Sequence, residues 1–142
     1  MNDKVFVDTN ILMYAHDESA GEKHQRAKVI LEQLWESGRP ALSIQVLQEL
    51  CVNLRRRISP PLPDEKIRWF IEDYFSWEVV IPEPKFILEA MDIEDHYKIS
   101  FSDALIICSA ENCGATVLYS EDFSHRQRYG SVQVINPLLD SN

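Results

Sequence analysis

The chain alternates short apolar stretches with longer segments of helical periodicity. The short stretches predict strands at residues 5–7, 41–43, 77–81, 116–119 and 132–135. Between them, apolar residues recur three and four positions apart, which predicts helices at 11–15, 22–37, 44–57, 64–76, 85–96 and 101–112. Strands that alternate with helices form parallel sheets through right-handed crossovers. We therefore expect an α/β fold with three α/β/α layers and a central, mostly parallel sheet of about five strands.

No linker, repeat or low-complexity segment divides the chain, so we expect a single domain over residues 1–142. The first residues lead directly into a strand and do not resemble a signal peptide, and no apolar run approaches the length of a membrane span. Cys51, Cys108 and Cys113 lack the spacing of a zinc site and lie in apolar surroundings. We expect them to be buried free thiols, as in a cytoplasmic protein with no membrane association.

The net charge of −9 argues against a protein that holds nucleic acid by bulk electrostatic attraction. Two explanations stay open at this point. Divalent cations could neutralise an acidic pocket, or a basic partner could cover part of the surface. The charge alone does not distinguish between them.

The first strand ends abruptly in polar residues, because the apolar run 5–7 is followed directly by Asp8, Thr9 and Asn10. A continuous apolar run is typical of a strand buried on both faces of a parallel sheet. Ligands bind such sheets outside the carboxyl ends of the strands, so Asp8 stands where a catalytic group is expected. The alternative is that Asp8 or Thr9 only caps the helix that follows.

The predicted topology brings three further acids to the same edge of the sheet. The helix that carries Asp103 in its first turn is joined to the next strand by a very short turn, so its N-terminus lies at the carboxyl edge of that strand. Asp122 follows the same strand, and Glu49 lies in the second turn of the helix after the second strand. Four carboxylates, including Asp8, are thus predicted to converge.

Each of these acids also has a purely structural explanation. Asp103 stands three residues after Ser100 and before an apolar run, which is typical of a capping box. Glu49 lies opposite the apolar stripe of its helix, where a solvated glutamate is common, and Asp122 fits an ordinary turn. Independent caps and turns need not converge on one edge, however, which favours a shared site.

Carboxylates held within a few ångströms of one another repel and raise each other's pKa unless a cation lies between them. Carboxylate oxygens without histidine or cysteine partners suit Mg²⁺ or Mn²⁺. Such a metal can orient a water, help to deprotonate it and neutralise charge on a phosphodiester. The four histidines do not show the paired spacing of a zinc site.

Four segments of the sequence resemble, in order, the motifs of PIN-domain nucleases. They are Val7-Asp8-Thr9-Asn10, Ser43-x-Gln45-Val46-x-x-Glu49, Ser100-x-x-Asp103-Ala104-Leu105-Ile106 and Ser120-Glu121-Asp122-Phe123. With the closing Val134-Ile135-Asn136-Pro137, their spacing is most similar to that of the VapC-type toxins of bacterial toxin–antitoxin pairs. The resemblance covers essentially the whole chain.

This resemblance implies a PIN-like fold and a cytoplasmic endoribonuclease that depends on Mg²⁺ or Mn²⁺. It also implies an antitoxin protein as a partner, and a homodimer. The residues that match the family's catalytic, metal-binding acids are Asp8, Glu49, Asp103 and Asp122. Thr9 and Asn10 match its polar positions after the first acid, and Ser120 matches its hydroxyl position before the last one.

Two other classes of protein stay open. An α/β phosphatase or phosphotransferase could use Asp8 as a nucleophile, although that chemistry favours a second acid where this chain has Asn10. A non-catalytic PIN-like domain that binds RNA or protein could retain the pocket without the activity, although the complete set of acids argues against it.

Two surface positions are further candidates. Trp69 points away from the expected core-facing side of its helix, which makes it a candidate contact for an antitoxin or a second subunit. The residues expected on the core-facing side are Ile67, Phe70, Ile71, Tyr74 and Phe75. Arg56 lies in the densest basic run and shares a helical face with Glu49, so it is a candidate contact for RNA phosphates. The alternative for Arg56 is a solvated cation that favours the helix C-terminus.

Overall fold

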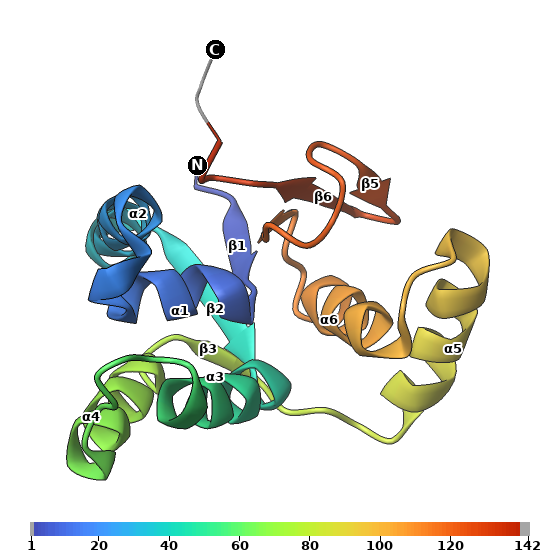
Figure 1. Ribbon diagram of the computed structural model, residues 1–142. Coiled ribbons are helices and arrows are strands. Elements are labelled where there is room, and N and C mark those ends of the chain that lie inside the picture. The colour runs from blue at the N-terminus through green and yellow to red at the C-terminus, as the bar shows by residue number, and fades with distance from the viewer. Residues whose placement is uncertain (1, 140–142) are drawn as a thin grey trace.

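The structure is a computed structural model that describes residues 2–139, and its centre is a six-stranded sheet (Figure 1). The strands are β1 (Lys4–Val7), β2 (Arg39–Ser43), β3 (Glu78–Val80), β4 (Val117–Tyr119), β5 (Arg128–Tyr129) and β6 (Val132–Ile135). They lie in the order β3-β2-β1-β4-β6-β5, and all neighbours are parallel except β5 and β6. β1 is thus an interior strand, as its continuous apolar sequence predicts.

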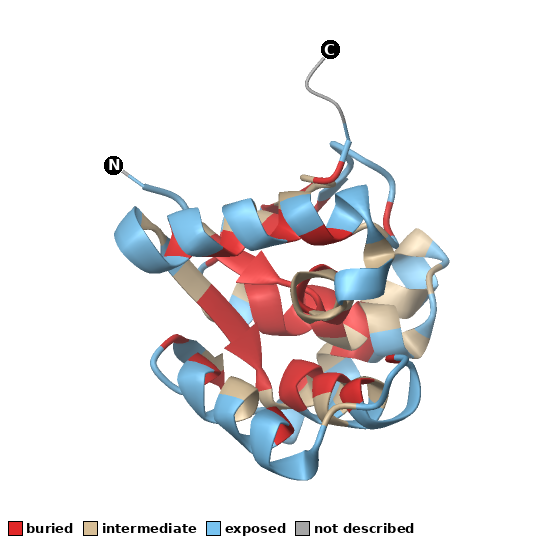
Figure 2. Cartoon of the chain, turned by 60° about the vertical axis from the view of Figure 1, so that its left-hand side comes forward, coloured by how far each residue is buried: buried red, intermediate tan, exposed pale blue. Residues whose placement is uncertain are grey.

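Helices connect the strands and cover both faces of the sheet. They are α1 (Thr9–His16), the short 3₁₀ helix η1 (Glu18–Ala20), α2 (Glu22–Ser37), α3 (Ile44–Arg56), α4 (Asp64–Tyr74), α5 (Lys85–Tyr97) and α6 (Phe101–Asn112). Figure 2 shows buried strands between helices whose outer faces are exposed. The prediction of three α/β/α layers around a mostly parallel sheet is confirmed.

One continuous apolar core joins the sheet to the helices. Phe6, Leu42 and Leu118, from the adjacent strands β1, β2 and β4, are fully buried. The helix α6 contacts strands β2, β4 and β6 and also α5, which lies at the edge of the molecule (Figure 1). Contacts with both the sheet and α5 explain why α6 is apolar on nearly all sides.

The register of the sheet brings the ends of β1 and β4 together. Val7 is paired with Tyr119, and the backbone N–H of Asp8 donates to the carbonyl of Tyr119 at 2.9 Å. The residues that follow β1 and β4 therefore lie side by side. The helices α1 and α3 begin directly after β1 and β2, with Asp8 and Ser43 as their N-caps.

The structure has one strand more than the sequence predicts. β5 contains only Arg128 and Tyr129, and it pairs antiparallel with β6 across a turn at Gly130, whose φ of 60° suits glycine. Two residues are too few to show an alternating pattern. The helix α1 also begins earlier than predicted, at Thr9, because Asp8 provides its N-cap.

The core-facing side of α4 differs from the prediction at one position. Phe75 is 59% exposed, whereas Ile67 and Tyr74 are buried as expected, and Phe70 and Ile71 pack partly against the core. Phe75 is the C-cap residue, after the last helical turn, where the helical spacing no longer fixes which side is covered. Trp69 points outward as predicted and is 65% exposed.

The three cysteines are free thiols, as predicted, but only Cys108 is buried. Cys51 and Cys113 are partly exposed. Within residues 2–139, no helix combines the length and the apolar character that crossing a membrane requires.

Candidate functional site

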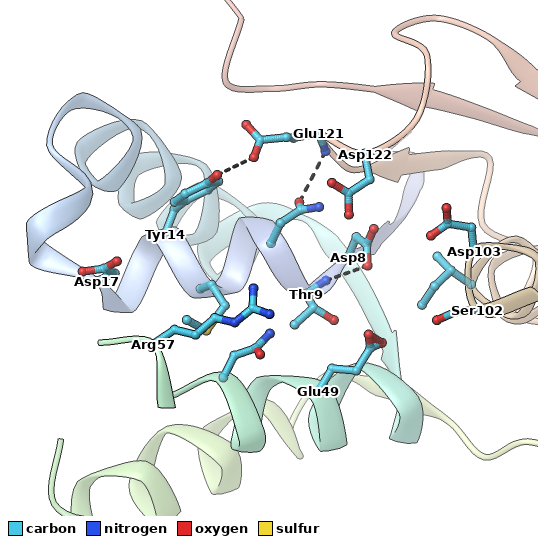
Figure 3. Close-up of a pocket in the computed structure, with 14 residues that line it drawn as sticks. Asp8, Thr9, Tyr14, Asp17, Glu49, Arg57, Ser102, Asp103, Glu121 and Asp122 are labelled. Carbon is cyan, nitrogen blue, oxygen red and sulfur yellow. Dashed lines mark hydrogen bonds between the residues drawn. The ribbon is translucent and has the colours of Figure 1, made fainter. Parts of the chain in front are cut away.

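A pocket of about 420 Å³ lies where β1 and β4 end. It is lined by residues of α1, α3, the start of α6 and the segment after β4 (Figure 3). All four acids singled out in the sequence line it: Asp8, Glu49, Asp103 and Asp122. Thr9 and Asn10 line it as well. The structure thus brings into one pocket acids that are up to 114 positions apart in the chain.

Asp8 is the most enclosed of these acids, with 5% of its surface exposed. Its Oδ1 accepts a hydrogen bond of 2.8 Å from the backbone N–H of Thr9, and its Oδ2 accepts one of 2.8 Å from the hydroxyl of Ser120. Burial raises the pKa of Asp8 to about 7 despite these hydrogen bonds, and the charges of Asp122 and Glu49 add to the increase. Asp8 therefore caps α1 and also belongs to a cluster of interacting carboxylates.

Glu49 and Asp103 have the same electrostatic character. Burial, and then the charge of Asp103, raise the pKa of Glu49, while the side chains of Thr9 and Gln45 oppose the increase. Burial also raises the pKa of Asp103, the hydroxyl of Ser100 opposes the increase, and the charge of Asp122 adds to it. Glu49 is half-buried in the pocket, which argues against a simple solvated glutamate. These shifts indicate that the four carboxylates repel one another across the pocket.

Neighbouring hydroxyls perform the local structural roles that the sequence left open. Ser100 is the N-cap of α6, since its Oγ accepts the N–H of Asp103 at 3.1 Å. The Oγ of Ser120 accepts the N–H of Asp122 at 3.1 Å while its hydroxyl donates to Asp8. Ser120 is fully buried and so ties the segment after β4 to the end of β1.

Three buried polar atoms of the pocket lack a well-aligned hydrogen bond within residues 2–139: Asn10 Nδ2, and Thr9 Oγ1 and Glu49 Oε1, which lie close enough for Thr9 to lower the pKa of Glu49. A buried polar atom without a partner costs about 1–3 kcal/mol, so such atoms are rare unless a ligand or a water satisfies them. The three residues line the same pocket as Asp8, Asp103 and Asp122. These atoms are therefore available to a water or to a polar ligand in the pocket.

The donor set suits a hard cation, because it consists of carboxylate and hydroxyl oxygens. As the side chains stand, no group of three or more Asp, Glu, His or Cys residues in the described part of the chain is arranged to hold an ion. Mg²⁺ does not require such a group, since it usually keeps several waters and takes one or two carboxylates from the protein. The residues present therefore fit a partly hydrated Mg²⁺ or Mn²⁺.

The other end of the pocket holds an acid whose charge is balanced. Glu121 forms an ion pair of 2.8 Å with Lys23 and accepts a hydrogen bond from the hydroxyl of Tyr14 (Figure 3). Burial alone would raise the pKa of Glu121, but the hydrogen bonds from Lys23 and Tyr14 outweigh it and lower the pKa. The backbone N–H of Glu121 also donates to Asn10 Oδ1 at 3.3 Å. The sequence did not predict the contacts of Glu121 with Lys23, Tyr14 and Asn10. Its only indication was that Glu121 stands beside Asp122.

The basic residue in the pocket is Arg57, whereas the sequence pointed to Arg56. Glu49, Asn53 and Arg57 form an i, i+4, i+8 row along α3 and its C-cap, and all three line the pocket. Arg56 is exposed and does not line it. Rows of side chains at i+4 run obliquely to the helix axis, so the pocket wall reaches Arg57. An i+4 row that starts at Glu49 was the signal in the sequence that could have identified Arg57.

The fold and the pocket define an α/β protein with a cluster of acids at the carboxyl ends of its parallel strands. The PIN domain family matches residues 5–130, and the chain belongs to this family. No curated protein sequence matches the chain.

Several solved structures share the fold over most of their length. FitAB bound to an IR36 DNA fragment has a TM-score of 0.74 at 15% identity, covering 97% of this chain and 98% of that chain. VapBC2 from Rickettsia felis, bound to a DNA fragment from its promoter, has a TM-score of 0.64 at 20% identity, with 92% and 96% covered. The sarcin–ricin-loop-cleaving toxin VapC20 of Mycobacterium tuberculosis has a TM-score of 0.65 at 21% identity, with 84% and 91% covered. At these identities the similarity establishes the fold alone.

Proposed function

We propose that the protein is a Mg²⁺- or Mn²⁺-dependent endoribonuclease and the toxin of a toxin–antitoxin pair. The observation that carries the proposal is the cluster of uncompensated carboxylates in one pocket, with Asp8 buried and its pKa raised by burial to about 7. Family membership and the similarity to VapBC2 and to the RNA-cleaving toxin VapC20 support the class of activity. We also propose one domain over residues 1–142, since the family matches most of that length.

Asp8, Glu49, Asp103 and Asp122 are the residues proposed to hold the cation. A bound Mg²⁺ or Mn²⁺ would supply a polarised water and would neutralise charge on the phosphodiester. The backbone N–H of Thr9 and the hydroxyl of Ser120 fix both oxygens of Asp8, which orients this carboxylate toward the pocket. Asn10 Nδ2, which has no partner within residues 2–139, is available to hydrogen-bond a water or a phosphate oxygen.

The same contacts weigh against a phosphotransferase that uses Asp8 as its nucleophile. Both carboxylate oxygens of Asp8 already accept hydrogen bonds, and the side chain is almost completely buried. An attacking oxygen must be exposed to the phosphorus atom, and hydrogen bonds to it lower its nucleophilicity. A metal ligand, in contrast, benefits from an orientation fixed in this way.

The proposal is tested by incubating the purified protein with single-stranded RNA in Mg²⁺, in Mn²⁺ and in chelator. We expect internal cleavage with either metal, none in chelator, and a loss of about a hundredfold or more in Asp8→Asn. Cleavage that survives both chelator and the Asp8→Asn substitution would contradict the proposal. A covalent phosphoenzyme trapped with a phosphate-ester substrate would favour the phosphotransferase instead.

The proposed partners are an antitoxin protein and a second copy of the chain, in the cytoplasm. Several of the structural neighbours are toxin–antitoxin complexes, which supports an antitoxin for this chain. We propose Trp69 as an anchor for one of these partners, because it is 65% exposed on α4 beside Pro63, Glu65 and Lys66. Trp69→Ala should leave the unfolding midpoint nearly unchanged and weaken partner binding or dimerisation. Unchanged affinity and unchanged oligomeric state would remove Trp69 from the proposal.

A further inference from the structure

Arg57 is the one basic side chain among the described residues that line the acidic pocket. The acids that line the pocket are Asp8, Asp17, Glu49, Asp103, Glu121 and Asp122. Figure 3 shows the guanidinium of Arg57 pointing into the pocket. A single cation in a pocket of this composition is a candidate for recognising an anionic ligand.

The side chain of Arg57 forms no ion pair or hydrogen bond within residues 2–139, although the pocket is rich in carboxylates. Two of the pocket acids already have partners of their own. Glu121 is paired with Lys23, and Asp17 caps η1 by accepting hydrogen bonds from Ser19. The donors of Arg57 are therefore available to a ligand.

The row of residues on α3 sets the distance between this cation and the acid cluster. Glu49 and Arg57 are eight residues apart, which corresponds to about 12 Å along the helix axis. Asn53 lies between them and also lines the pocket. The flexible arginine side chain shortens this separation, so a strand whose phosphate lies at the acids can bring a neighbouring phosphate to Arg57.

We propose that Arg57 binds the RNA phosphate next to the one that is cut and thereby fixes the direction in which the strand crosses the pocket. This inference rests on the proposed function, since it assumes an RNA strand in the pocket. A guanidinium matches a phosphate with two parallel hydrogen bonds, whereas the four acids Asp8, Glu49, Asp103 and Asp122 require a cation before they accept a phosphate. Arg57 is thus a substrate-positioning residue, separate from the groups that hold the metal.

The first experiment measures binding rather than cleavage. In an Asp8→Asn background with Mg²⁺, the binding of a fluorescent random-sequence single-stranded RNA 12-mer is measured over a series of salt concentrations, with and without Arg57→Ala. We expect about tenfold weaker binding at low salt and a salt slope reduced by about 0.7, the value for one phosphate contact in a single strand. Arg57→Lys should restore the slope and part of the affinity, because it keeps the charge without the two-pronged geometry.

Arg56→Ala is the matched control. It removes the same charge from the adjacent position, which lies outside the pocket, so it should change affinity by less than about twofold. Equal effects of Arg56→Ala and Arg57→Ala would overturn the inference, since they would reveal only a general influence of net charge.

The second experiment locates the phosphate. On an RNA that the parent protein cuts at a mapped bond, single methylphosphonates remove the charge from one phosphate at a time. The effect of Arg57→Ala on single-turnover cleavage should disappear when the phosphate beside the cut is neutral and persist when distant ones are. A constant effect at every position overturns the inference while leaving the proposed function intact. If the parent protein neither binds nor cuts RNA, the result contradicts both the inference and the proposed function.

Discussion

The acids at the two ends of the pocket differ in whether neighbouring side chains balance their charge. At one end, burial raises the pKa of Asp8, Glu49 and Asp103, and within residues 2–139 no cation is paired with any of the three. At the other end, Lys23 and Tyr14 bind Glu121 and lower its pKa although it is partly buried. Asp122, the neighbour of Glu121 in sequence, belongs with the first group, since its charge contributes to the raised pKa of Asp8, Glu49 and Asp103.

This difference separates a structural carboxylate from functional ones. An acid that serves the fold is expected to have its charge balanced, since unpaired charges in a pocket destabilise the native state. Glu121 meets this expectation and links α1, α2 and the segment after β4 through Tyr14, Lys23 and Asn10. Asp8, Glu49 and Asp103 do not meet it, so their arrangement requires another explanation, and cation binding provides one.

The most direct test of this difference removes the charge of Asp122 and that of Glu121 in separate variants. Asp122→Asn should reduce RNA cleavage by about a hundredfold or more, because it removes a proposed metal ligand. Glu121→Gln should cost less than about tenfold, since it acts only through the position of its neighbours. The measurement is the single-turnover cleavage rate at saturating Mg²⁺. Equal losses would mean that the two ends of the pocket have the same role.

The convergence of the acids could be predicted from the sequence because it follows from topology. Each acid stands directly after a strand or near the start of a helix, and parallel strands bring such positions to one edge. The local cap explanations were incomplete for the same reason. Asp8 does cap α1, yet its second oxygen is bound by Ser120, which is 112 positions away.

The balance of charge in the pocket could not be predicted, because it depends on contacts between distant side chains. Nothing in the segment around Glu121 indicates Lys23, which lies 98 positions earlier. The sequence pointed to Arg56 instead of Arg57 for a similar reason. Helical spacing predicts which side chains share a face, but the direction in which the pocket crosses α3 is set by packing against α1.

The pH dependence of the free energy of unfolding tests directly whether the charge of Asp8 is unbalanced in the folded protein. The pKa of Asp8 is about 7 in the folded protein and near 3.8 in the unfolded chain, so the folded state binds the proton more tightly. Stability from this group is therefore full below about pH 4 and is lost as the pH rises toward 7. In chelator, the free energy of unfolding of the parent should fall by about 2 kcal/mol more than that of Asp8→Asn between pH 5 and pH 7. Denaturant titrations at both pH values check this, and parallel curves for the two proteins would contradict it.

Metal binding should distinguish the two ends by a somewhat smaller effect. At a Mg²⁺ or Mn²⁺ concentration about ten times the dissociation constant, the parent should gain about 1.4 kcal/mol of stability. Asp8→Asn and Asp122→Asn should gain less, because fewer ligands bind the ion, and in chelator they should be at least as stable as the parent. Glu121→Gln is the control and should respond to metal as the parent does. Thermal melts with chelator and with metal provide the comparison, and equal shifts in all four proteins would argue against a shared metal site.

The smallest expected effect is the direct interaction between Lys23 and Glu121. Half of the Lys23 side chain is exposed, so solvent screens the ion pair even though its N–O distance is 2.8 Å. A double-mutant cycle with Lys23→Met and Glu121→Gln should give a coupling free energy below about 1 kcal/mol in denaturant titrations. The coupling should shrink in high salt, as it does for exposed charges. A second cycle, with Lys23→Met and Asp122→Asn, should give a coupling free energy near zero, because the side chain of Lys23 contacts Glu121 and Tyr14 and not Asp122. A larger coupling with Asp122 than with Glu121 would mean that Lys23 balances the acid cluster itself, and the contrast between the two ends of the pocket would no longer hold.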